Sequence, residues 1–437
     1  MYDLAVIGVG PAGLEAIQIA VKNGLKVVAF EDVEVGGTCL NVGCIPTKSI
    51  LHSSNLLKKI NSSSNVGINL FAAADCDWSR VLARKIEIVN KFTKLLNSSL
   101  SKKITLVKAQ AELFINYDKL EIYADDNVYE AKNIIVATGS EAIGLPGLNF
   151  DGNFVINSDD ILKMEKLPKK IVIVGSGAIG LEWAKILSDF GCSVKIVEKA
   201  PVLAPILDVE LQKRVERILK QNNIEYYKND YIVSVSNDLV TLKSGVVFDV
   251  DCIFVAIGRK PKMPKVAIGG CAEEFVLKPE IDGTTDMENL FVAGDAMGRT
   301  MLAHSASYQA RSIMNKILFN KEITPKAIPS VIYLSPEIAS IGLREQDIQG
   351  HDGFIVKKML ISSIAKSWCD DSSDGLIKII IKDDLIYGAH IVAKCASEMI
   401  SLFSVFIDKQ IKISEIEDMI FPHPSYAEAI LEVIKNG

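Results

Sequence analysis

The stretch Leu4-Ala-Val-Ile-Gly8-Val-Gly10-Pro-Ala-Gly13 decides the fold. Its apolar first half is typical of a buried strand, its second half is typical of a tight turn, and residues 14–23 have helical periodicity. A second strand is expected over 26–30. In such a unit the glycines permit the turn, the approach of a pyrophosphate and the packing of helix on strand. We therefore expect a dinucleotide to bind at Gly8, Gly10, Pro11, Ala12 and Gly13.

The same pattern occurs a second time. Residues 170–174 are expected to form a strand, and Gly175-Ser-Gly177-Ala-Ile-Gly180 the turn before another helix. An acid lies eighteen positions after the third glycine in each copy, Glu31 in the first and Glu198 in the second. A carboxylate at this point accepts hydrogen bonds from ribose hydroxyls. Two complete copies predict two dinucleotide-binding folds, whereas one glycine-rich run alone is compatible with a turn that binds nothing.

Glu198 also predicts which nicotinamide cofactor binds to the second fold. A carboxylate accepts from a free 2′-hydroxyl and repels a 2′-phosphate. Residues 199–204, which come directly after it, contain no arginine that would neutralise such a phosphate. We therefore expect NAD rather than NADP, bound by Gly175, Gly177, Gly180 and Glu198.

Composition limits the classes of protein to consider. The chain has 437 residues, 49% hydrophobic and 23% charged, which suits a globular protein of about two to four domains. A net charge of −6 argues against nucleic-acid binding, and no apolar run is long enough for a transmembrane helix.

Residues 2–9 already resemble a buried strand, so we expect no targeting segment. Eight scattered cysteines are not a disulfide framework, which favours the cytoplasm. We assign no metal site.

The remaining sequence predicts an α/β protein whose last part differs in character. Residues 77–100 have helical periodicity, and 104–136 alternate as strands do. From about residue 328, strand-like and helical segments mix, which predicts a C-terminal α+β domain. The serine-rich run 61–65 is expected to be a loop tip. The fold class is therefore two Rossmann-like dinucleotide-binding domains and then an α+β domain.

The stretch Gly36-Gly-Thr-Cys39-Leu-Asn-Val-Gly-Cys44-Ile-Pro-Thr-Lys48 is the most informative one for chemistry. Four residues separate the two cysteines, which places their thiols about one helical turn apart, close enough to form a disulfide. The glycines allow close packing against a planar ring. Two ordinary buried thiols are the alternative, since buried cysteines are common in cores.

This stretch resembles the active-site signature of the pyridine nucleotide–disulfide oxidoreductases, and within them most closely that of the dihydrolipoamide dehydrogenases. The resemblance extends over almost the whole chain. Besides the cysteine motif and the two nucleotide folds, it rests on these segments: Ala137-Thr-Gly139, Phe291-Val-Ala-Gly294-Asp295, Met301-Leu-Ala303-His304, 328–333 with Pro336-Glu337, and His423-Pro424 with Glu428.

The resemblance implies roles around a redox-active disulfide of Cys39 and Cys44. Cys44 would lie next to the flavin and Cys39 would exchange with substrate, chemistry that requires a thiolate. Lys48 would sit near the flavin, paired with Glu182. The first fold would bind FAD, with Glu31 at the adenosine ribose. The implied further cofactor contacts are Gly37, Thr38, Lys48, Thr138, Gly139, Asp295, Met301, Leu302, Ala303 and His304 for the flavin, and Gly258 and Arg259 for the nicotinamide.

The resemblance also implies a catalytic base and a dimer. His423 resembles the base and Glu428 the carboxylate that orients it, and an imidazole suits proton transfer near neutral pH. In the family this pair comes from the other subunit, so a C2 homodimer is expected. The implied segments are 1–145 (FAD-binding, first part), 146–265 (NAD-binding), 266–325 (central, second part of the FAD-binding domain) and 326–437 (dimerisation).

The implied activity is the FAD-dependent oxidation of protein-bound dihydrolipoamide with reduction of NAD⁺. The implied partners are the lipoyl and subunit-binding domains of an E2 acyltransferase, which the chain would serve as the E3 component of a 2-oxo acid dehydrogenase complex. A glutathione reductase would need arginines after the second fold, and a mercuric reductase a C-terminal cysteine pair, whereas the last cysteine here is Cys395. A flavoprotein docked to a complex without turnover is the alternative from another class.

Several positions depart from the family pattern. Relatives often carry a second histidine where this chain has Phe421, and the loop from Glu31 to Gly36 is one residue short. The tail after Glu428 has nine residues, and 305–309 differs from the usual charged version. These departures bear on partner binding and rim contacts more than on chemistry.

Overall fold

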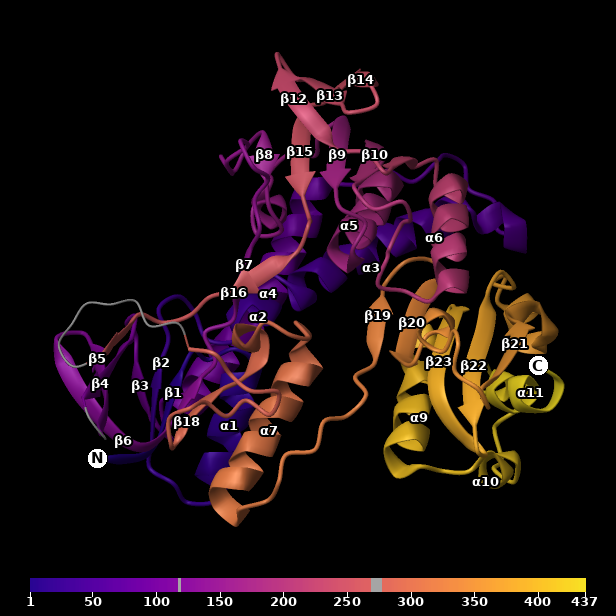
Figure 1. The fold of residues 1–437 in the computed structure, drawn as a ribbon. Helices are drawn as coiled ribbons and strands as arrows, with labels where there is room; N and C mark the ends of the chain where they lie inside the picture. The colour runs from indigo at the N-terminus through magenta and orange to yellow at the C-terminus, as the bar shows by residue number, and fades with distance from the viewer. Residues whose placement is uncertain (117–118, 269–276) are drawn as a thin grey trace.

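The computed structural model describes residues 1–116, 119–268 and 277–437. Figure 1 shows three lobes, each built around its own β-sheet: an N-terminal lobe, a second lobe above it, and a C-terminal lobe beside both. Among the described residues, no helix is long and apolar enough to cross a membrane.

The N-terminal lobe contains an eight-stranded sheet of order β17-β4-β5-β6-β1-β2-β3, with β18 also paired to β6. Strands β1, β2, β3 and β18 run parallel, while β4, β5 and β6 form antiparallel hairpins. β1 is central and its last four residues are buried, which explains the unbroken apolar run at the start of the sequence. The strands are β1 Tyr2–Ile7, β2 Val27–Phe30, β3 Thr105–Val107, β4 Glu112–Asn116, β5 Lys119–Ala124, β6 Asn127–Val136, β17 Val266–Ile268 and β18 Leu290–Val292.

Five helices belong to this lobe. α1 and α7 pack together on one face of the sheet, where their small residues permit close contact. α4 packs against α3, and in the described chain only its last residue, Leu100, is buried. The helices are α1 Pro11–Lys22, α2 Gly37–Asn41, α3 Cys44–Asn61, α4 Trp78–Leu100 and α7 Ala303–Phe319.

The second lobe repeats the strand–turn–helix–strand unit. Its five-stranded sheet is parallel throughout, in the order β11-β10-β9-β15-β8, and α5 comes after the glycine turn that ends β9. A small antiparallel sheet, β12-β13-β14, projects from it, and β7 pairs with β16 where the chain passes between the lobes. The elements are β7 Ser140–Ala142, β8 Val155–Ile156, β9 Lys170–Val174, α5 Ala178–Asp189, β10 Ser193–Glu198, α6 Val209–Gln221, β11 Glu225–Lys228, β12 Ile232–Ser236, β13 Leu239–Leu242, β14 Val247–Asp249, β15 Cys252–Val255 and β16 Arg259–Pro261.

The C-terminal lobe is an antiparallel sheet of order β19-β20-β23-β22-β21 with helices packed against it. β22 is buried over its first six residues, mostly isoleucines, with Lys378 as the one buried charge among them. α9 packs against β20 and β23. The elements are β19 Ser330–Ile332, β20 Glu337–Gly342, β21 Ile355–Leu360, α8 Ala365–Cys369, β22 Leu376–Lys382, β23 Leu385–Ala393, α9 Ala396–Lys409, α10 Ile413–Glu417 and α11 Glu428–Asn436.

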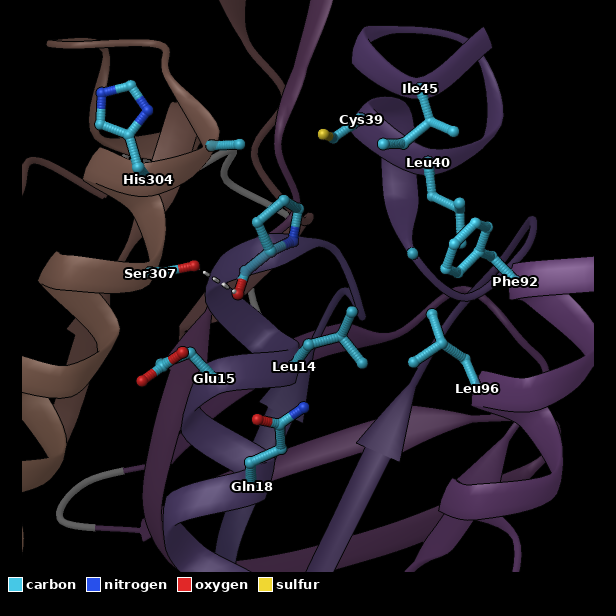
Figure 2. A pocket seen from close by; sticks show the side chains of 13 residues that line it. Leu14, Glu15, Gln18, Cys39, Leu40, Ile45, Phe92, Leu96, His304 and Ser307 are labelled. Atoms are coloured by element: carbon cyan, nitrogen blue, oxygen red, sulfur yellow. Dashed lines mark hydrogen bonds between the residues drawn. The ribbon is translucent and has the colours of Figure 1, made fainter. Parts of the chain in front are cut away.

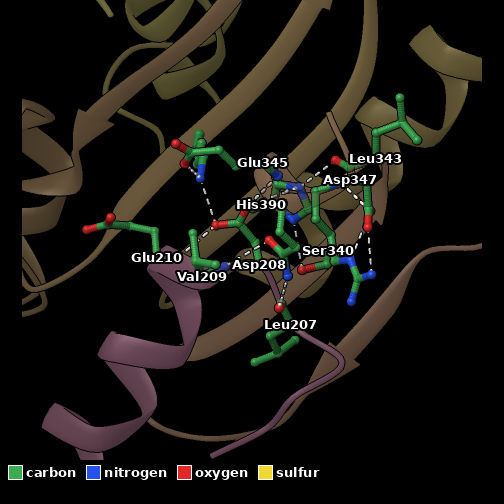
Figure 3. A network of polar contacts seen from close by, with 12 residues as sticks. Leu207, Asp208, Val209, Glu210, Ser340, Leu343, Glu345, Asp347 and His390 are labelled. Carbon is green, nitrogen blue, oxygen red and sulfur yellow. Dashed lines mark hydrogen bonds and ion pairs between the residues drawn. The ribbon is translucent and has the colours of Figure 1, made fainter. Parts of the chain in front are cut away.

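A buried polar cluster joins the second lobe to the C-terminal lobe (Figure 3). Asp208, which caps α6, contacts Lys378 Nζ at 2.8 Å, and both side chains are fully buried. Lys378 also pairs with Glu345. His390 is equally buried, with Nε2 at 2.8 Å from the carbonyl oxygen of Leu343, so Nε2 carries the proton. Burial holds the pKa of His390 below its usual value.

The predicted α/β class and the α+β character of the C-terminal part are confirmed, as are both strand–turn–helix–strand units. Two local expectations were wrong. The cysteine motif is not one helical turn, because α2 ends at Asn41 and α3 begins only at Cys44. The serine-rich run is not a simple loop tip, because Ser63–Val66 forms a 3₁₀ helix directly after α3.

Candidate functional site

The two glycine turns show why each glycine is needed. A Cβ on Gly13 would lie 2.1 Å from the carbonyl oxygen of Gly8, and one on Gly180 would lie 2.2 Å from that of Gly175. Helix and strand therefore meet only because these positions lack a side chain. A Cβ on Gly177, by contrast, would stand in open space, which leaves the N-terminus of α5 accessible. The turns fit pyrophosphates approaching helix N-termini.

The acids at the strand ends are tied back to these turns. Oε2 of Glu31 accepts from the amide of Val9 at 2.8 Å, and Oε2 of Glu198 accepts from the amide of Ser176 at 2.8 Å. Burial raises the pKa of Glu31, although two amide hydrogen bonds oppose it. A carboxylate has more acceptor positions than these bonds use, so both can also accept from ribose hydroxyls.

The two cysteines come from two helices that are separated by a short turn. Cys39 lies in α2, and Cys44 is the first residue of α3. Gly43 allows the chain to turn back between them, because a Cβ there would lie 2.7 Å from the carbonyl oxygen of Thr38. Both cysteines are free thiols in this structure.

The two thiols have different acidities. A hydrogen bond from the Cys39 thiol lowers the pKa of Cys44 to about 7, with help from the charge of Lys48 and against the effect of burial. The same hydrogen bond, together with burial, raises the pKa of Cys39. Cys44 also occupies a helix N-terminus, where the backbone dipoles favour a negative charge. The reduced pair therefore holds its negative charge on Cys44.

Lys48 and Glu182 form an ion pair between the first and second lobes. Lys48 Nζ lies 2.6 Å from Oε2 of Glu182, whose side chain is almost buried. The other oxygen, Oε1, accepts from the amide of Tyr333 at 3.1 Å, and Lys48 lies 4.5 Å from the centre of the Tyr333 ring. Glu182, which lies in α5 of the second lobe, is therefore held by residues of the other two lobes. It fixes Lys48 one turn after Cys44.

A groove of about 410 Å³ leads to Cys39 (Figure 2). It lies over α1, with Phe92 and Leu96 of α4 on one side and His304 and Ser307 of α7 on the other. Its lining is mostly apolar. The lining residues are Pro11, Leu14, Glu15, Gln18, Gly36, Cys39, Leu40, Ile45, Phe92, Leu96, Ala303, His304 and Ser307.

His423 and Glu428 are paired, but away from this groove. His423 Nδ1 lies 2.7 Å from Oε1 of Glu428, whose Oε2 accepts from the amide of Ser425 at 2.8 Å. These two hydrogen bonds lower the pKa of Glu428. The His423 side chain is 74% exposed, and the pair lies in the C-terminal lobe, across the molecule from α2 (Figure 1). One chain therefore does not bring His423 to its own cysteines.

The other expected cofactor residues lie in the segments after β6, β15 and β18 and at the start of α7. Asp295 comes after β18 and accepts from Ser140 Oγ at 2.6 Å. Thr138 donates to the carbonyl oxygen of Lys262.

Met301 and Leu302 precede α7, Ala303 begins it, and His304 Nε2 contacts the carbonyl oxygen of Pro329 at 2.7 Å. Gly139 and Gly258 take left-handed conformations between strands, and Arg259 begins β16.

Sequence reasoning missed three polar side chains that shape the site. Asn41 Nδ2 donates to the carbonyl oxygens of Val35 and Gly37, both at 3.0 Å, and so ties α2 to the loop before it. Gln309 accepts from the amide of Gly294 at 2.8 Å, and Ser140 contacts Asp295. Serine, asparagine and glutamine are too common for their positions alone to have identified them.

Comparison with known families agrees with this geometry. Residues 2–310 match the pyridine nucleotide-disulphide oxidoreductase family, and residues 328–434 match the dimerisation domain of that family. The chain belongs to the pyridine nucleotide-disulphide oxidoreductases. Membership confirms the expected fold class and the cofactor pair of FAD and NAD. It also shows that the chain carries a dimerisation domain.

Individual relatives cover the whole chain. Dihydrolipoyl dehydrogenase of Mycoplasma genitalium is 30% identical over 458 aligned positions, which cover 100% of this chain and 98% of the relative. Dihydrolipoyl dehydrogenase of Bacillus subtilis is 31% identical, with coverages of 99% and 97%. The crystal structure of LpdA from Mycobacterium tuberculosis has a TM-score of 0.90 at 22% identity, covering 99% of each chain, and shows that the fold is shared.

Proposed function

We propose that this protein is an NAD-dependent dihydrolipoyl dehydrogenase, with Cys39 and Cys44 as its redox-active disulfide. The observation that carries the proposal is the groove at Cys39, which is lined mainly by apolar side chains such as Leu14, Phe92 and Leu96. Such a lining suits the alkyl arm of a lipoyl group better than a charged peptide like glutathione. Full-length similarity to dihydrolipoyl dehydrogenases supports the same interpretation.

The proposed cofactor sites lie along the two turns. FAD would lie along the first turn and Glu31, with Gly37, Thr38, Lys48, Asp295 and residues 301–304 around it, and NAD along the second turn and Glu198. When bound, the two cofactors supply hydride transfer, which no side chain of this chain provides. The chain itself holds them in place and keeps the charge of Lys48 beside Cys44.

The proposed reaction begins at the disulfide. A base removes the proton from one thiol of dihydrolipoamide, and the resulting thiolate attacks Sγ of Cys39. The bond between the two cysteines breaks, and Cys44 leaves as a thiolate that its lowered pKa stabilises. The second substrate thiol then displaces Cys39, which closes the lipoamide ring and leaves the cysteine pair reduced by two electrons. NAD⁺ is the final acceptor of these electrons.

The proposed base is His423 from a second copy of the chain. Because Nδ1 is held by Glu428, Nε2 is left to take the substrate proton. The dimerisation domain supports the homodimer that this arrangement requires. The further partners are the lipoyl and subunit-binding domains of an E2 acyltransferase in a 2-oxo acid dehydrogenase complex. The cysteines outside the motif, such as the buried Cys192 and Cys252, suit a reducing compartment like the cytoplasm.

The test is the oxidation of dihydrolipoamide by the full-length holoprotein and by Cys39→Ser. The substitution removes the sulfur that is attacked, so we expect NADH formation to fall by a factor of about 10³ or more, as for other lost nucleophiles. Cys252→Ser, which changes a buried cysteine in the core of the second lobe, is the matched control and should keep most of its rate. An unchanged rate in Cys39→Ser would sink the proposal.

A further inference from the structure

Asp295 is held by a short chain of hydrogen bonds that starts in the second lobe. Ser140 Oγ donates to Oδ2 of Asp295 at 2.6 Å. Arg259 donates twice to Ser140, from Nε to Oγ at 2.8 Å and from Nη2 to the carbonyl oxygen at 2.8 Å. Ser140 is 8% exposed, and the Arg259 side chain is 11% exposed. The three side chains therefore form a shielded, directional contact.

The chemistry of these groups decides where the hydroxyl proton points. A guanidinium only donates, so Ser140 Oγ must accept from Arg259. The single hydroxyl proton is then directed at the carboxylate of Asp295, which only accepts. Hydrogen bonds to a charged group are stronger than neutral ones, so Arg259 and Asp295 reinforce this orientation from opposite sides.

The far end of Arg259 is anchored as well. Nη1 donates to Ser158 Oγ at 3.2 Å and lies 3.9 Å from Oδ1 of Asp159. Both residues lie just after β8, in the second lobe. The backbone is held in the same way, because β7 and β16 pair antiparallel and put Arg259 beside Ala142. The guanidinium therefore has little freedom to turn away from Ser140.

We propose that Ser140 and Arg259 are positioning residues, which occupy Oδ2 of Asp295 and so present Oδ1 to the flavin. Within the parts of the chain that the structure describes, Oδ1 receives no hydrogen bond from the protein. The inference rests on the proposed contact of Asp295 with FAD. It adds Ser140 to the flavin site and gives the Arg259 side chain a role on the flavin side.

The test measures FAD binding to the apo form of the full-length protein, by the change in flavin fluorescence on reconstitution. We expect Ser140→Ala to weaken FAD binding about tenfold, the factor that 1.4 kcal/mol represents. Ser140→Thr keeps the hydroxyl and should restore most of the affinity, which a merely structural role for Ser140 would not explain. The melting temperature of each apo variant should stay close to that of the parent.

Two further variants separate the possible failures. Ser367→Ala is the matched control, because Ser367 is also buried but donates to the carbonyl oxygen of Ile364 in the C-terminal lobe; its FAD affinity should not change. If Asp295→Asn weakens FAD binding while Ser140→Ala does not, the positioning role is wrong and the flavin site stands. If Asp295→Asn has no effect, the proposed contact itself is wrong.

Arg259→Lys decides the question if Ser140→Ala does not fold. Lysine keeps the positive charge but loses the fork that reaches Ser140 and Ser158 together. We expect FAD binding several-fold weaker than in the parent, and parental affinity in this variant would overturn the inference.

Discussion

The first dinucleotide fold, around β1 and α1, and the second, around β9 and α5, hold their acids alike. One oxygen of each carboxylate accepts from the residue after the first glycine, Val9 or Ser176, at 2.8 Å. The other oxygen of Glu198 accepts from the amide two residues on at 2.8 Å, and that of Glu31 does so at 3.1 Å. In the second fold a hydroxyl also binds the acid, because Ser176 Oγ donates to Glu198 at 2.6 Å. The matching residue of the first fold, Val9, has no hydroxyl.

The two folds differ more in the segments to which they connect. The first continues into the cysteine motif, and Gly37 approaches the turn so closely that a Cβ on it would lie 2.8 Å from the Cα of Gly10. The second continues into α6 and the polar cluster at the C-terminal lobe. In the proposed function, the same unit serves two purposes. The first copy would bring FAD to the cysteine pair, and the second would bring NAD to a surface that the C-terminal lobe supports.

The largest expected effect separates a packing glycine from a binding glycine. Gly13→Ala places a Cβ against the carbonyl oxygen of Gly8, so we expect loss of bound FAD and of activity. Gly177→Ala meets open space, so the protein should fold and keep FAD, while KM for NADH rises about tenfold because the pyrophosphate is crowded. Flavin absorbance and steady-state kinetics measure both. Equal behaviour of the two variants would contradict the distinction.

The next effect concerns the thiol pair that only the first fold carries. Lys48→Met removes the positive charge that helps to lower the pKa of Cys44, so this pKa should rise from about 7 by about one unit or more. At neutral pH less Cys44 is then a thiolate. The thiolate absorbance of the reduced protein, titrated between pH 5 and 10, checks the shift. Lys58→Met, at the far end of α3, is the control and should leave the titration unchanged.

A smaller effect tests the acids against each other. Glu198→Gln removes the charge that repels a 2′-phosphate, so the preference for NADH over NADPH should fall about tenfold. Glu31→Gln, at the matching place in the first fold, should weaken FAD binding and leave the nicotinamide preference unchanged. The ratio of kcat/KM for the two nucleotides measures this. If Glu31→Gln changes the preference for NADH over NADPH and Glu198→Gln does not, then the nicotinamide binds to the first fold and the assignment of the two folds is wrong.

The smallest expected effect concerns His390, in the buried polar cluster that joins the second lobe to the C-terminal lobe. Burial lowers the pKa of His390, so the unfolded chain binds a proton there that the folded chain does not. Its stability contribution is complete above the unfolded pKa of about 6.5 and is lost as pH falls below it. His390→Gln should therefore flatten the decline of Tm between pH 6.5 and 5, by roughly 2 °C. An identical decline in parent and variant would exclude this role.

Much of the fold can be predicted from local patterns in the sequence. Both strand–turn–helix–strand units were predicted because glycine spacing and apolar runs are local properties, and residues 170–198 illustrate this well. The break between α2 and α3 was not predicted, because it depends on Gly43 turning the chain back toward Thr38. The Lys48–Glu182 pair came from family resemblance, since no local pattern joins residues 134 positions apart.

The polar contacts of the site were the hardest to anticipate. The Ser140–Asp295 bond spans 155 positions and depends on how β7 meets β16. The buried cluster around Lys378 was missed because its members look like ordinary charged residues of strands and loops. Burial and pairing between distant segments decide these contacts, and neither can be read from spacing.

The measurement that tests the central claim most directly is the steady-state rate of the purified holoprotein with two thiol substrates and two nucleotides. Dihydrolipoamide and reduced glutathione are each paired with NAD⁺ and with NADP⁺ under identical conditions. The proposed function predicts rapid NADH formation from dihydrolipoamide with NAD⁺, at least tenfold slower turnover with NADP⁺, and little with glutathione. Faster turnover with glutathione and NADP⁺ would contradict it.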